Sequence, residues 1–266
     1  MINSNDHIFA SADAGWGDLI APGLGNDIIE GNDDLWNDGG GSDVTYEEFD
    51  TEDLGIYFSM SDSGQDGVAF LGSTLSPSSA NGVSASYDSF KWVDYIIGTD
   101  DADKFYLPTT HQFGLQPRGG DDHIVGGADA YSWVDYKSND TEAGIIVSMS
   151  DAVETVTTSD LSTLTSTITI DANAADHGVV YDPWGGLDTL VNISSVRGTP
   201  YRDIFFGSSS DDHFVGRDGD NDFHGYDGDD TFAIGDYGDN YADGGAGSDK
   251  IRGNVYDVDI DKFEAA

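Results

Sequence analysis

Six side chains that carry carboxylate or amide oxygens recur at a fixed spacing in residues 198–252. They occupy the sixth place of consecutive nine-residue units, with one extra residue, Ile234, after the fourth unit. The six are Asp203, Asp212, Asn221, Asp230, Asn240 and Asp249. Hard cations such as Ca²⁺ prefer oxygen ligands of this kind, and short side chains in turns can present them. These ligands at this spacing therefore suit a hard, large cation.

The other positions of each unit suit a turn followed by a short strand. Position one is always glycine, at Gly198, Gly207, Gly216, Gly225, Gly235 and Gly244. Glycine at positions one and four is expected to permit backbone conformations with positive φ. Position eight is apolar, at Phe205, Phe214, Phe223, Phe232, Ala242 and Ile251. Alternation along a strand turns position eight inward and positions seven and nine toward water, so stacked coils would bury a thin apolar column.

This repeat resembles the G-G-x-G-x-D-x-U-x nonapeptide of the hemolysin-type, repeats-in-toxin (RTX) calcium-binding proteins. The resemblance implies an all-β fold, a right-handed parallel β-helix or β-roll solenoid with calcium-binding nonapeptide turns. It also implies that the position-six side chains bind several Ca²⁺ ions together with turn carbonyls, in units that begin at Gly207, Gly216, Gly225, Gly235 and Gly244. Six units make three coils, and family geometry then gives ~4 sites.

Weaker copies of the unit precede the regular block. P-G-L-G-N-D-I-I-E, from Pro22, places Asp27 at position six, and D-G-G-G-S-D-V-T-Y places Asp43 there. Two further units offer Asp103 and Asp122, separated by an irregular stretch at 108–116. These four aspartates are further candidate calcium ligands.

A longer pattern also occurs twice. Residues 143–151 repeat 54–62, a Ser/Thr-rich stretch follows each copy, and Gly198-Thr199 echoes Gly98-Thr99. Both copies are expected to form wider coils with longer strands between the turns. The predicted organisation is an N-terminal cap (1–21), a first module (22–116), a second module (117–197), the regular roll (198–252) and a C-terminal cap or secretion segment (253–266), all in one continuous solenoid.

Composition narrows the class of protein. The formal net charge is −41, and aspartate outnumbers glutamate 44 to 7, a preference that suits turns and short-armed metal ligation. Self-repulsion at this charge opposes a compact metal-free state, which bound cations would relieve. The chain has no cysteine and no basic patch, so disulfides, thiol chemistry and nucleic-acid binding are excluded or disfavoured. No apolar run reaches the length of a membrane span, and no basic-plus-apolar signal peptide appears.

Other chemistry is poorly supported by the sequence. An EF-hand alignment that begins at Asp220 puts Thr231 where glutamate is required. His123, His213 and His224 are expected to point outward into solvent. No H-E-x-x-H or G-x-S-x-G motif occurs, and among 51 acidic residues no single carboxylate pair stands out as catalytic. Segments 133–136 and 181–184 could form a sugar-stacking platform, although core or cap packing is the simpler interpretation.

The predicted function is a secreted calcium-binding module that folds on binding extracellular Ca²⁺ and acts as a structural or binding element, with carbohydrate or a cell surface as the partner. The resemblance implies export by type I secretion, and the chain is expected to be a monomer. A polysaccharide-acting lyase, epimerase or hydrolase on the same scaffold is one alternative, and a surface adhesion or lattice protein is another. The sequence leaves open whether the protein is an enzyme.

Overall fold

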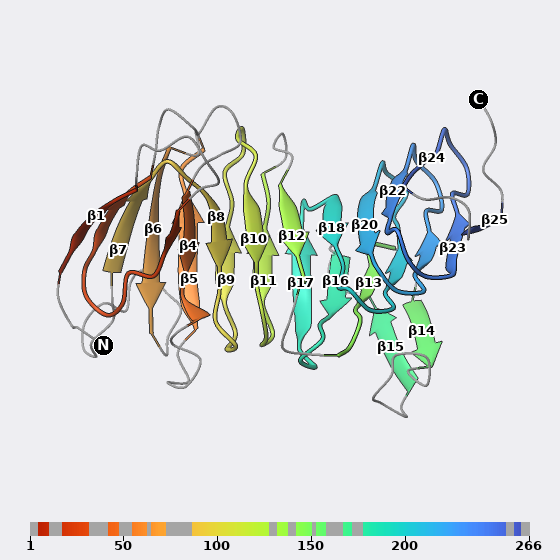
Figure 1. Ribbon diagram of the computed structural model, residues 1–266, viewed down its shortest axis with the longest axis horizontal. Helices are drawn as coiled ribbons and strands as arrows, with labels where there is room; N and C mark the ends of the chain where they lie inside the picture. The colour runs from red at the N-terminus through yellow and green to blue at the C-terminus, as the bar shows by residue number, and fades with distance from the viewer. Residues whose placement is uncertain are drawn as a thin grey trace. The chain divides into compact units, whose positions relative to one another are not determined.

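The computed structural model describes residues 5–10, 18–31, 42–47, 55–62, 65–72, 87–127, 132–137, 142–150, 153–157, 167–171, 178–253 and 258–261 (Figure 1). Strands and turns make up these residues, and among them no helix is long and apolar enough to cross a membrane. The chain divides into two compact units, Met1–Trp133 and Val134–Ala266, which we call unit 1 and unit 2. The junction between the units lies within strand β12 (Trp133–Asp135).

Unit 1 is built from two mostly parallel sheets. The first has the strand order β1 (His7–Phe9), β3 (Ile28–Glu30), β7 (Tyr87–Lys91), β6 (Asp66–Leu71), β5 (Ile56–Met60), β9 (Lys104–Tyr106) and β11 (His123–Val125). The second has the order β2 (Leu19–Ile20), β4 (Ser42–Thr45), β8 (Val93–Ile97) and β10 (Gly114–Gln116). The segment predicted as a cap at 1–21 thus contributes a strand to each sheet, and the irregular stretch at 108–116 contains β10.

Unit 2 repeats this arrangement. Its first sheet has the order β17 (Leu187–Val191), β16 (Gly178–Tyr181), β13 (Ile146–Ser148), β19 (Ile204–Phe206), β21 (Asp222–His224), β23 (Asn240–Asp243) and β25 (Val258–Asp261). Its second has the order β18 (Ser195–Arg197), β20 (His213–Arg217), β22 (Thr231–Ile234) and β24 (Lys250–Arg252). A separate antiparallel pair joins β14 (Val153–Thr157) and β15 (Thr167–Asp171). Strand β25, within the predicted cap at 253–266, pairs with β23.

The position-eight residues form the core of the regular block, as the period predicts. Phe205, Phe214, Phe223, Phe232 and Ala242 are fully buried, and only Ile251, in the last strand of its sheet, is half-buried. The phenylalanine rings stack, with ring centroids 5.0 Å apart for Phe205 and Phe223 and 5.2 Å apart for Phe223 and Phe232. Mostly parallel sheets, a strand about every nine residues and stacked aromatic rungs confirm a parallel β-helix or β-roll solenoid.

The repeated modules have longer strands, as predicted, but one strand in each interrupts the expected parallel stack. In unit 1, β6 runs antiparallel to both β5 and β7, and in unit 2, β16 runs antiparallel to both β13 and β17. Each module therefore inserts a reversed strand between two parallel rungs. Alternation of apolar and polar residues is the same in parallel and antiparallel strands, so the pattern alone could not reveal the reversal.

Positive φ explains the glycines of position four but not those of position one. Gly219, Gly228 and Gly238, at position four, have φ between 98° and 118°. The position-one glycines do not have positive φ; instead, a Cβ atom at Gly225 or Gly244 would collide with Oδ2 of the position-six aspartate of the same unit. At Gly225 and Gly244, glycine is therefore required because a carboxylate lies where a side chain would begin.

Candidate functional site

The position-six side chains lie in two columns, one along each edge of the roll where the strands begin. Asp212, Asp230 and Asp249 precede the stacked strands β20, β22 and β24, and we call them the aspartate column. Asp203 and Asn221 precede β19 and β21, Asn240 is the first residue of β23, and we call these three the asparagine column. Five of the six side chains are buried, and Asp249 is half-buried.

Within each column, the position-six side chain bonds to the backbone of the preceding coil. Oδ1 of Asp230 accepts from the N–H of Asp212 at 2.8 Å, and Oδ1 of Asp249 accepts from the N–H of Asp230 at 3.0 Å. The asparagine column has the same bonds, at 2.9 Å between Asp203 N and Asn221 Oδ1 and 3.0 Å between Asn221 N and Asn240 Oδ1. Carboxylate and amide are equivalent in this role because Oδ1 is the acceptor in both.

Position five supplies a second set of bonds that run the opposite way, which the sequence reasoning missed. The N–H of Asp229 donates to Oδ1 of Asp211 at 2.8 Å, and the N–H of Ser248 donates to Oδ1 of Asp229 at 2.8 Å. The N–H of Asp239 likewise donates to Oδ1 of Asp220. Adjacent Asp-Asp, Asp-Asn and Asn-Asp pairs at positions five and six are the sequence signal that could have revealed this double ladder.

The two columns differ at the second oxygen or nitrogen of the side chain. Oδ2 of Asp230 and Oδ2 of Asp249 are buried and make no hydrogen bond, whereas Oδ2 of Asp212 accepts from the N–H of Ser208 at 2.6 Å. In the asparagine column, the amide Nδ2 of Asn221 donates to the carbonyl oxygens of Asp218 and Gly219 at 3.3 Å, and Nδ2 of Asn240 donates to the carbonyl of Gly238 at 3.2 Å. The asparagine column satisfies its own turn carbonyls, and the aspartate column does not.

Burial makes these carboxylates hard to ionise. Desolvation raises the pKa of Asp230 to about 7, with Asp212, Asp249 and Asp211 adding repulsion, although the N–H of Asp212 opposes the change. Desolvation also raises the pKa of Asp212 to about 6 and that of Asp203 to about 8. A positive charge beside these groups would recover the cost of keeping them ionised.

The position-one glycines line the same turns. A Cβ atom on Gly207 would collide with the carbonyl oxygen of Gly225, and one on Gly216 would lie 2.7 Å from Nδ2 of Asn221. A Cβ atom on Gly235 would collide with the carbonyl of Arg217. Because they have no side chain, these glycines, together with Gly225 and Gly244, leave room for the close packing of the turns.

Three of the four upstream candidates occupy equivalent turn positions. Asp27 and Asp122 are buried, and their Oδ1 atoms accept from the N–H groups of Asp6 and Asp103, both at 2.7 Å. Oδ2 of Asp27 makes no hydrogen bond. Asp43 differs, because it lies inside β4. Burial, with repulsion from Asp94, raises the pKa of Asp43 to about 6.

Asp103 and Asp203 hold matching turns in the two units. Oδ2 of each accepts from the N–H of the threonine four residues earlier, Thr99 at 2.9 Å and Thr199 at 2.8 Å, and Oδ1 accepts from the same threonine's hydroxyl. Both acids also accept from the first residue of an inserted module, Ile56 at 2.7 Å and Ile145 at 2.9 Å. Both oxygens of each of these two carboxylates therefore have hydrogen-bond donors within the chain.

The residues considered for other chemistry have structural roles. His123, His213 and His224 are half-buried on outward-facing positions. The hydroxyl of Ser195 lies 3.2 Å from Nδ1 of His213, but Ser195 is 1% exposed and so is not presented to a substrate. Of the sugar-platform segments, 133–136 contributes Tyr136 to the core, where its hydroxyl donates to Oδ2 of Asp188 at 2.7 Å.

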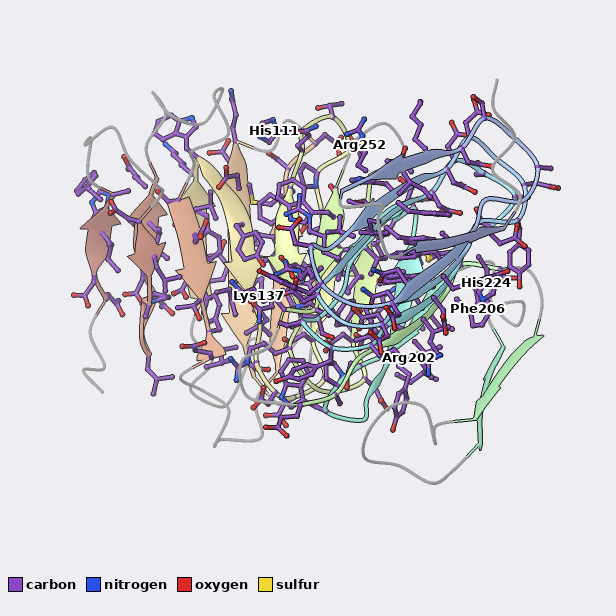
Figure 2. The ribbon with its side chains drawn as sticks, turned by 45° about the vertical axis from the view of Figure 1, so that its right-hand side comes forward. His111, Lys137, Arg202, Phe206, His224 and Arg252 are labelled. Carbon is purple, nitrogen blue, oxygen red and sulfur yellow. The ribbon has the colours of Figure 1, made fainter. Side chains whose placement is uncertain are left out.

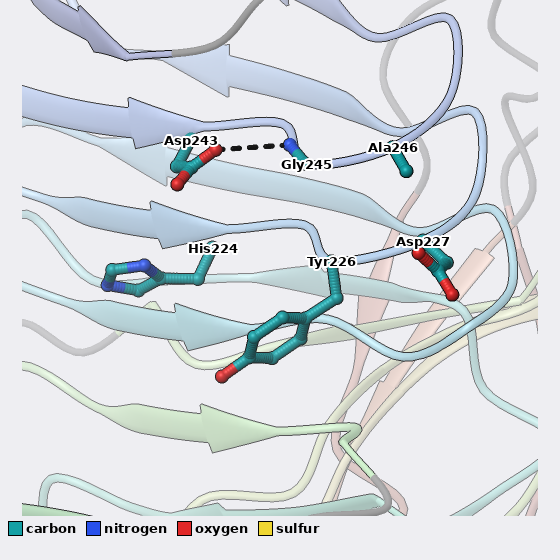
Figure 3. A pocket seen from close by; sticks show the side chains of 6 residues that line it. All are labelled: His224, Tyr226, Asp227, Asp243, Gly245 and Ala246. Atoms are coloured by element: carbon teal, nitrogen blue, oxygen red, sulfur yellow. Dashed lines mark hydrogen bonds between the residues drawn. The ribbon is translucent and has the colours of Figure 1, made fainter.

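A pocket of about 490 Å³ opens beside β21 and β23 in unit 2, and Figure 3 shows six residues that line it. His224 stacks on Phe206, with ring centroids 5.1 Å apart, and the two rings lie side by side in Figure 2. Tyr226 and Asp227 come from the next turn, and Oδ1 of Asp243 accepts from the N–H of Gly245 at 3.2 Å.

No three His, Cys, Asp or Glu side chains among the described residues gather to hold a metal ion.

No protein-family model and no curated protein matches the chain.

Proposed function

We propose that this chain is an RTX-type calcium-binding protein whose aspartate column binds Ca²⁺ and whose folding depends on that binding. The observation that carries the proposal is Oδ2 of Asp230, which belongs to a residue with 0% exposure and makes no hydrogen bond. A buried carboxylate oxygen without a hydrogen-bond partner lowers the stability of the fold, and a coordinated cation would offset this loss. The chain's charge of −41 adds to the demand for cations.

Ca²⁺ fits the donor set better than a transition metal does. The column offers only oxygen, from Asp212, Asp230, Asp249 and the carbonyls of glycine-rich turns. Because no three carboxylates gather to hold a metal ion within the described part of the chain, most ligands of each ion would be backbone carbonyls. Ca²⁺ accepts such mixed, flexible oxygen shells, whereas Mg²⁺ demands a strict octahedron.

The asparagine column is proposed to need no metal. The amide groups of Asn221 and Asn240 already donate to turn carbonyls that a cation would otherwise ligate. The number of sites in the regular block then falls from the ~4 of the family arrangement to one for each gap of the aspartate column. Those gaps lie between Asp212 and Asp230 and between Asp230 and Asp249. Asp27, with its own unpaired Oδ2, marks a further candidate in unit 1.

Calcium-dependent folding would suit a secreted protein that is exported unfolded. Where Ca²⁺ is scarce, repulsion among carboxylates favours an extended chain, and outside the cell metal binding supplies free energy of folding. The proposed protein is therefore an extracellular structural or binding module, exported as an unfolded chain by the type I route.

Calcium titration tests the proposal. The full chain is stripped with EGTA and titrated with Ca²⁺, with Mg²⁺ as the control, while far-ultraviolet circular dichroism and calorimetric heat are recorded. We expect a cooperative gain of β-structure with Ca²⁺ and little with Mg²⁺. A stripped chain that is already folded and gains no thermal stability from Ca²⁺ would refute the proposal.

A further inference from the structure

An unbroken run of aromatic rings crosses the outer face of unit 1. Neighbouring strands β7, β6, β5, β9 and β11 contribute Tyr87, Phe70, Tyr57, Tyr106 and His123, which we call the aromatic stripe. Successive ring centroids are 4.7, 6.1, 5.3 and 6.2 Å apart. Tyr87 is 42% exposed and the other four are half-buried, so the stripe lies at the surface and is separate from the buried column.

The stripe is anchored on the inserted antiparallel strands. Phe70 pairs directly with Tyr87 on one side and with Tyr57 on the other, in antiparallel register. The regular roll has no such insertion, so its outer face does not bring aromatic side chains from five strands together in this way. Edge-to-face packing, at 72° for Tyr57 and Phe70 and 68° for Phe70 and Tyr87, fixes the rings relative to one another.

Two rows of described residues on the outer face of these five strands contain no carboxylate. The row that contains Tyr87, Phe70 and Tyr57 continues in register to Lys104 and His123. It therefore contains one lysine and no carboxylate, although the chain as a whole has 51 acidic residues.

The adjacent outward row has the same character. Ser89, Val68, Ser59, Tyr106 and Val125 follow one another in register across the same five strands, again without a carboxylate. Serine and tyrosine hydroxyls therefore alternate with apolar surface on both rows. Acidic groups begin only at the next outward row, with Glu30 and Asp66.

We propose that the aromatic stripe binds a neutral polysaccharide chain that lies across strands β7 to β11. Sugar rings have apolar C–H faces that stack on aromatic rings and hydroxyls that bond to tyrosine and serine. The strands are spaced by about 4.7–4.9 Å, so the rings recur at intervals comparable to the size of one sugar ring. The fixed rings lose little freedom on binding, which favours affinity. The proposal deepens the binding-module function and does not depend on the calcium column.

The negative net charge of the chain disfavours two other partners for the aromatic stripe, a second copy of the chain and an anionic lipid surface. Two copies of a chain of charge −41 repel each other, so pairing of this face with itself is disfavoured. The same repulsion acts against an anionic lipid surface. A neutral glycan carries no charge and so is not repelled in either way.

The test is affinity electrophoresis of the full chain in native gels that contain laminarin, xyloglucan or galactomannan, with alginate as the anionic comparison. Each gel is run with Ca²⁺ and with EGTA, so that loss of folding is separated from loss of glycan binding. We expect at least one neutral glycan to retard the folded chain. The double variant Tyr87→Ser/Tyr106→Ser should bind about tenfold more weakly.

The control is Tyr237→Ser, because Tyr237 is 74% exposed in unit 2 and lies outside the stripe. It should bind as the parent does, and Tyr87→Trp should bind more tightly because its ring is larger. Circular dichroism confirms that each variant is folded. Absence of retardation by every neutral glycan, equal binding by the double variant, or binding to alginate alone would overturn the proposal. So would a dimer in light scattering that Tyr87→Ser abolishes, since that would make the stripe an interface between copies.

Discussion

The backbone N–H of Asp212 donates to Oδ1 of Asp230 in the next coil, 2.8 Å away, while Oδ2 of the same carboxylate makes no hydrogen bond. One oxygen of Asp230 therefore holds two coils together, and the other is left for a ligand from outside the chain. Asn221 has the same Oδ1 bond but uses its amide nitrogen on turn carbonyls. We propose that a turn requires a cation where the position-six residue is a carboxylate whose Oδ2 has no hydrogen-bond donor.

Replacing Asp230 by asparagine should have opposite effects in the two metal states. Asp230→Asn keeps the Oδ1 acceptor and gives the turn an amide donor, as at Asn221. The metal-free chain should gain about 1 kcal/mol of unfolding free energy, and calcium affinity should fall about tenfold. Urea unfolding in EGTA and calorimetric titration measure the two quantities.

The matched control for that variant is Asp220→Asn. It also removes one negative charge, but from an exposed position-five residue next to Asn221, outside the aspartate column. Both quantities should stay near their parent values. If Asp230→Asn instead destabilises the metal-free chain and leaves calcium affinity intact, Asp230 is a structural group and not a ligand.

Acid should stabilise the metal-free chain. The folded-state pKa values of Asp203, Asp230 and Asp212, about 8, 7 and 6, all lie above the ordinary value of 3.8. The folded chain therefore retains protons that the unfolded chain releases, so this stability is fully present below pH 3.8 and is lost as pH rises through 6 to 8. Chemical unfolding in EGTA at pH 4.5 and at pH 8 (roughly the two ends of this window) should give the higher midpoint in acid.

Calcium should reverse that trend. A cation in the aspartate column would hold Asp212 and Asp230 ionised, so calcium affinity should rise as pH rises through their pKa values, about 6 and 7. A metal-free chain that is more stable at the alkaline end, or a calcium affinity that falls with pH, would contradict the assignment of buried, cation-requiring carboxylates.

Two buried tyrosines should contribute equally to the two units. The hydroxyl of Tyr46 donates to Oδ2 of Asp88 at 2.6 Å in unit 1, and that of Tyr136 donates to Oδ2 of Asp188 at 2.7 Å in unit 2. Tyr46→Phe and Tyr136→Phe each leave a buried carboxylate oxygen without its donor, which should cost about 1–3 kcal/mol. Thermal unfolding in saturating Ca²⁺ measures the loss. Tyr237→Phe, at an exposed site, should change nothing, and an equally small effect of all three would contradict the prediction.

The phenylalanine column should be the main apolar support of the regular block. Phe223 is fully buried between Phe205 and Phe232, so Phe223→Ala should cost about 3–5 kcal/mol through the cavity that it leaves. Tyr237→Ala is the exposed control and should cost less than about 0.5 kcal/mol. Urea unfolding in Ca²⁺ distinguishes the two, and equal losses would show that the column is not the core.

The sequence predicted the parts of the fold that local rules determine. The nine-residue period predicted that the position-eight residues from Phe205 to Ala242 point inward, which follows from strand alternation. It also predicted positive φ at Gly219, which follows from turn geometry. It did not predict that β6 and β16 are reversed, since strand direction depends on contacts between distant segments. It gave the wrong reason for Gly225, whose role depends on where the carboxylate of Asp230 lies.

The difference between the two columns was visible in the sequence but was not interpretable there. Asn221 and Asn240 were grouped with the aspartates because either side chain can offer an oxygen to calcium. Only the hydrogen bonds of Nδ2 show that the asparagines satisfy the turn from within. The aromatic stripe was likewise invisible, because Phe70 comes to lie between Tyr57 and Tyr87 only through the antiparallel insertion.

The central claim is that calcium occupies the aspartate column and not the asparagine column. The most direct measurement is a crystal structure of the calcium-soaked chain with anomalous difference maps recorded at a long wavelength. The account predicts anomalous peaks between Asp212 and Asp230 and between Asp230 and Asp249, with none between Asn221 and Asn240. Peaks confined to the asparagine column, or no peak in either column at saturating Ca²⁺, would contradict it.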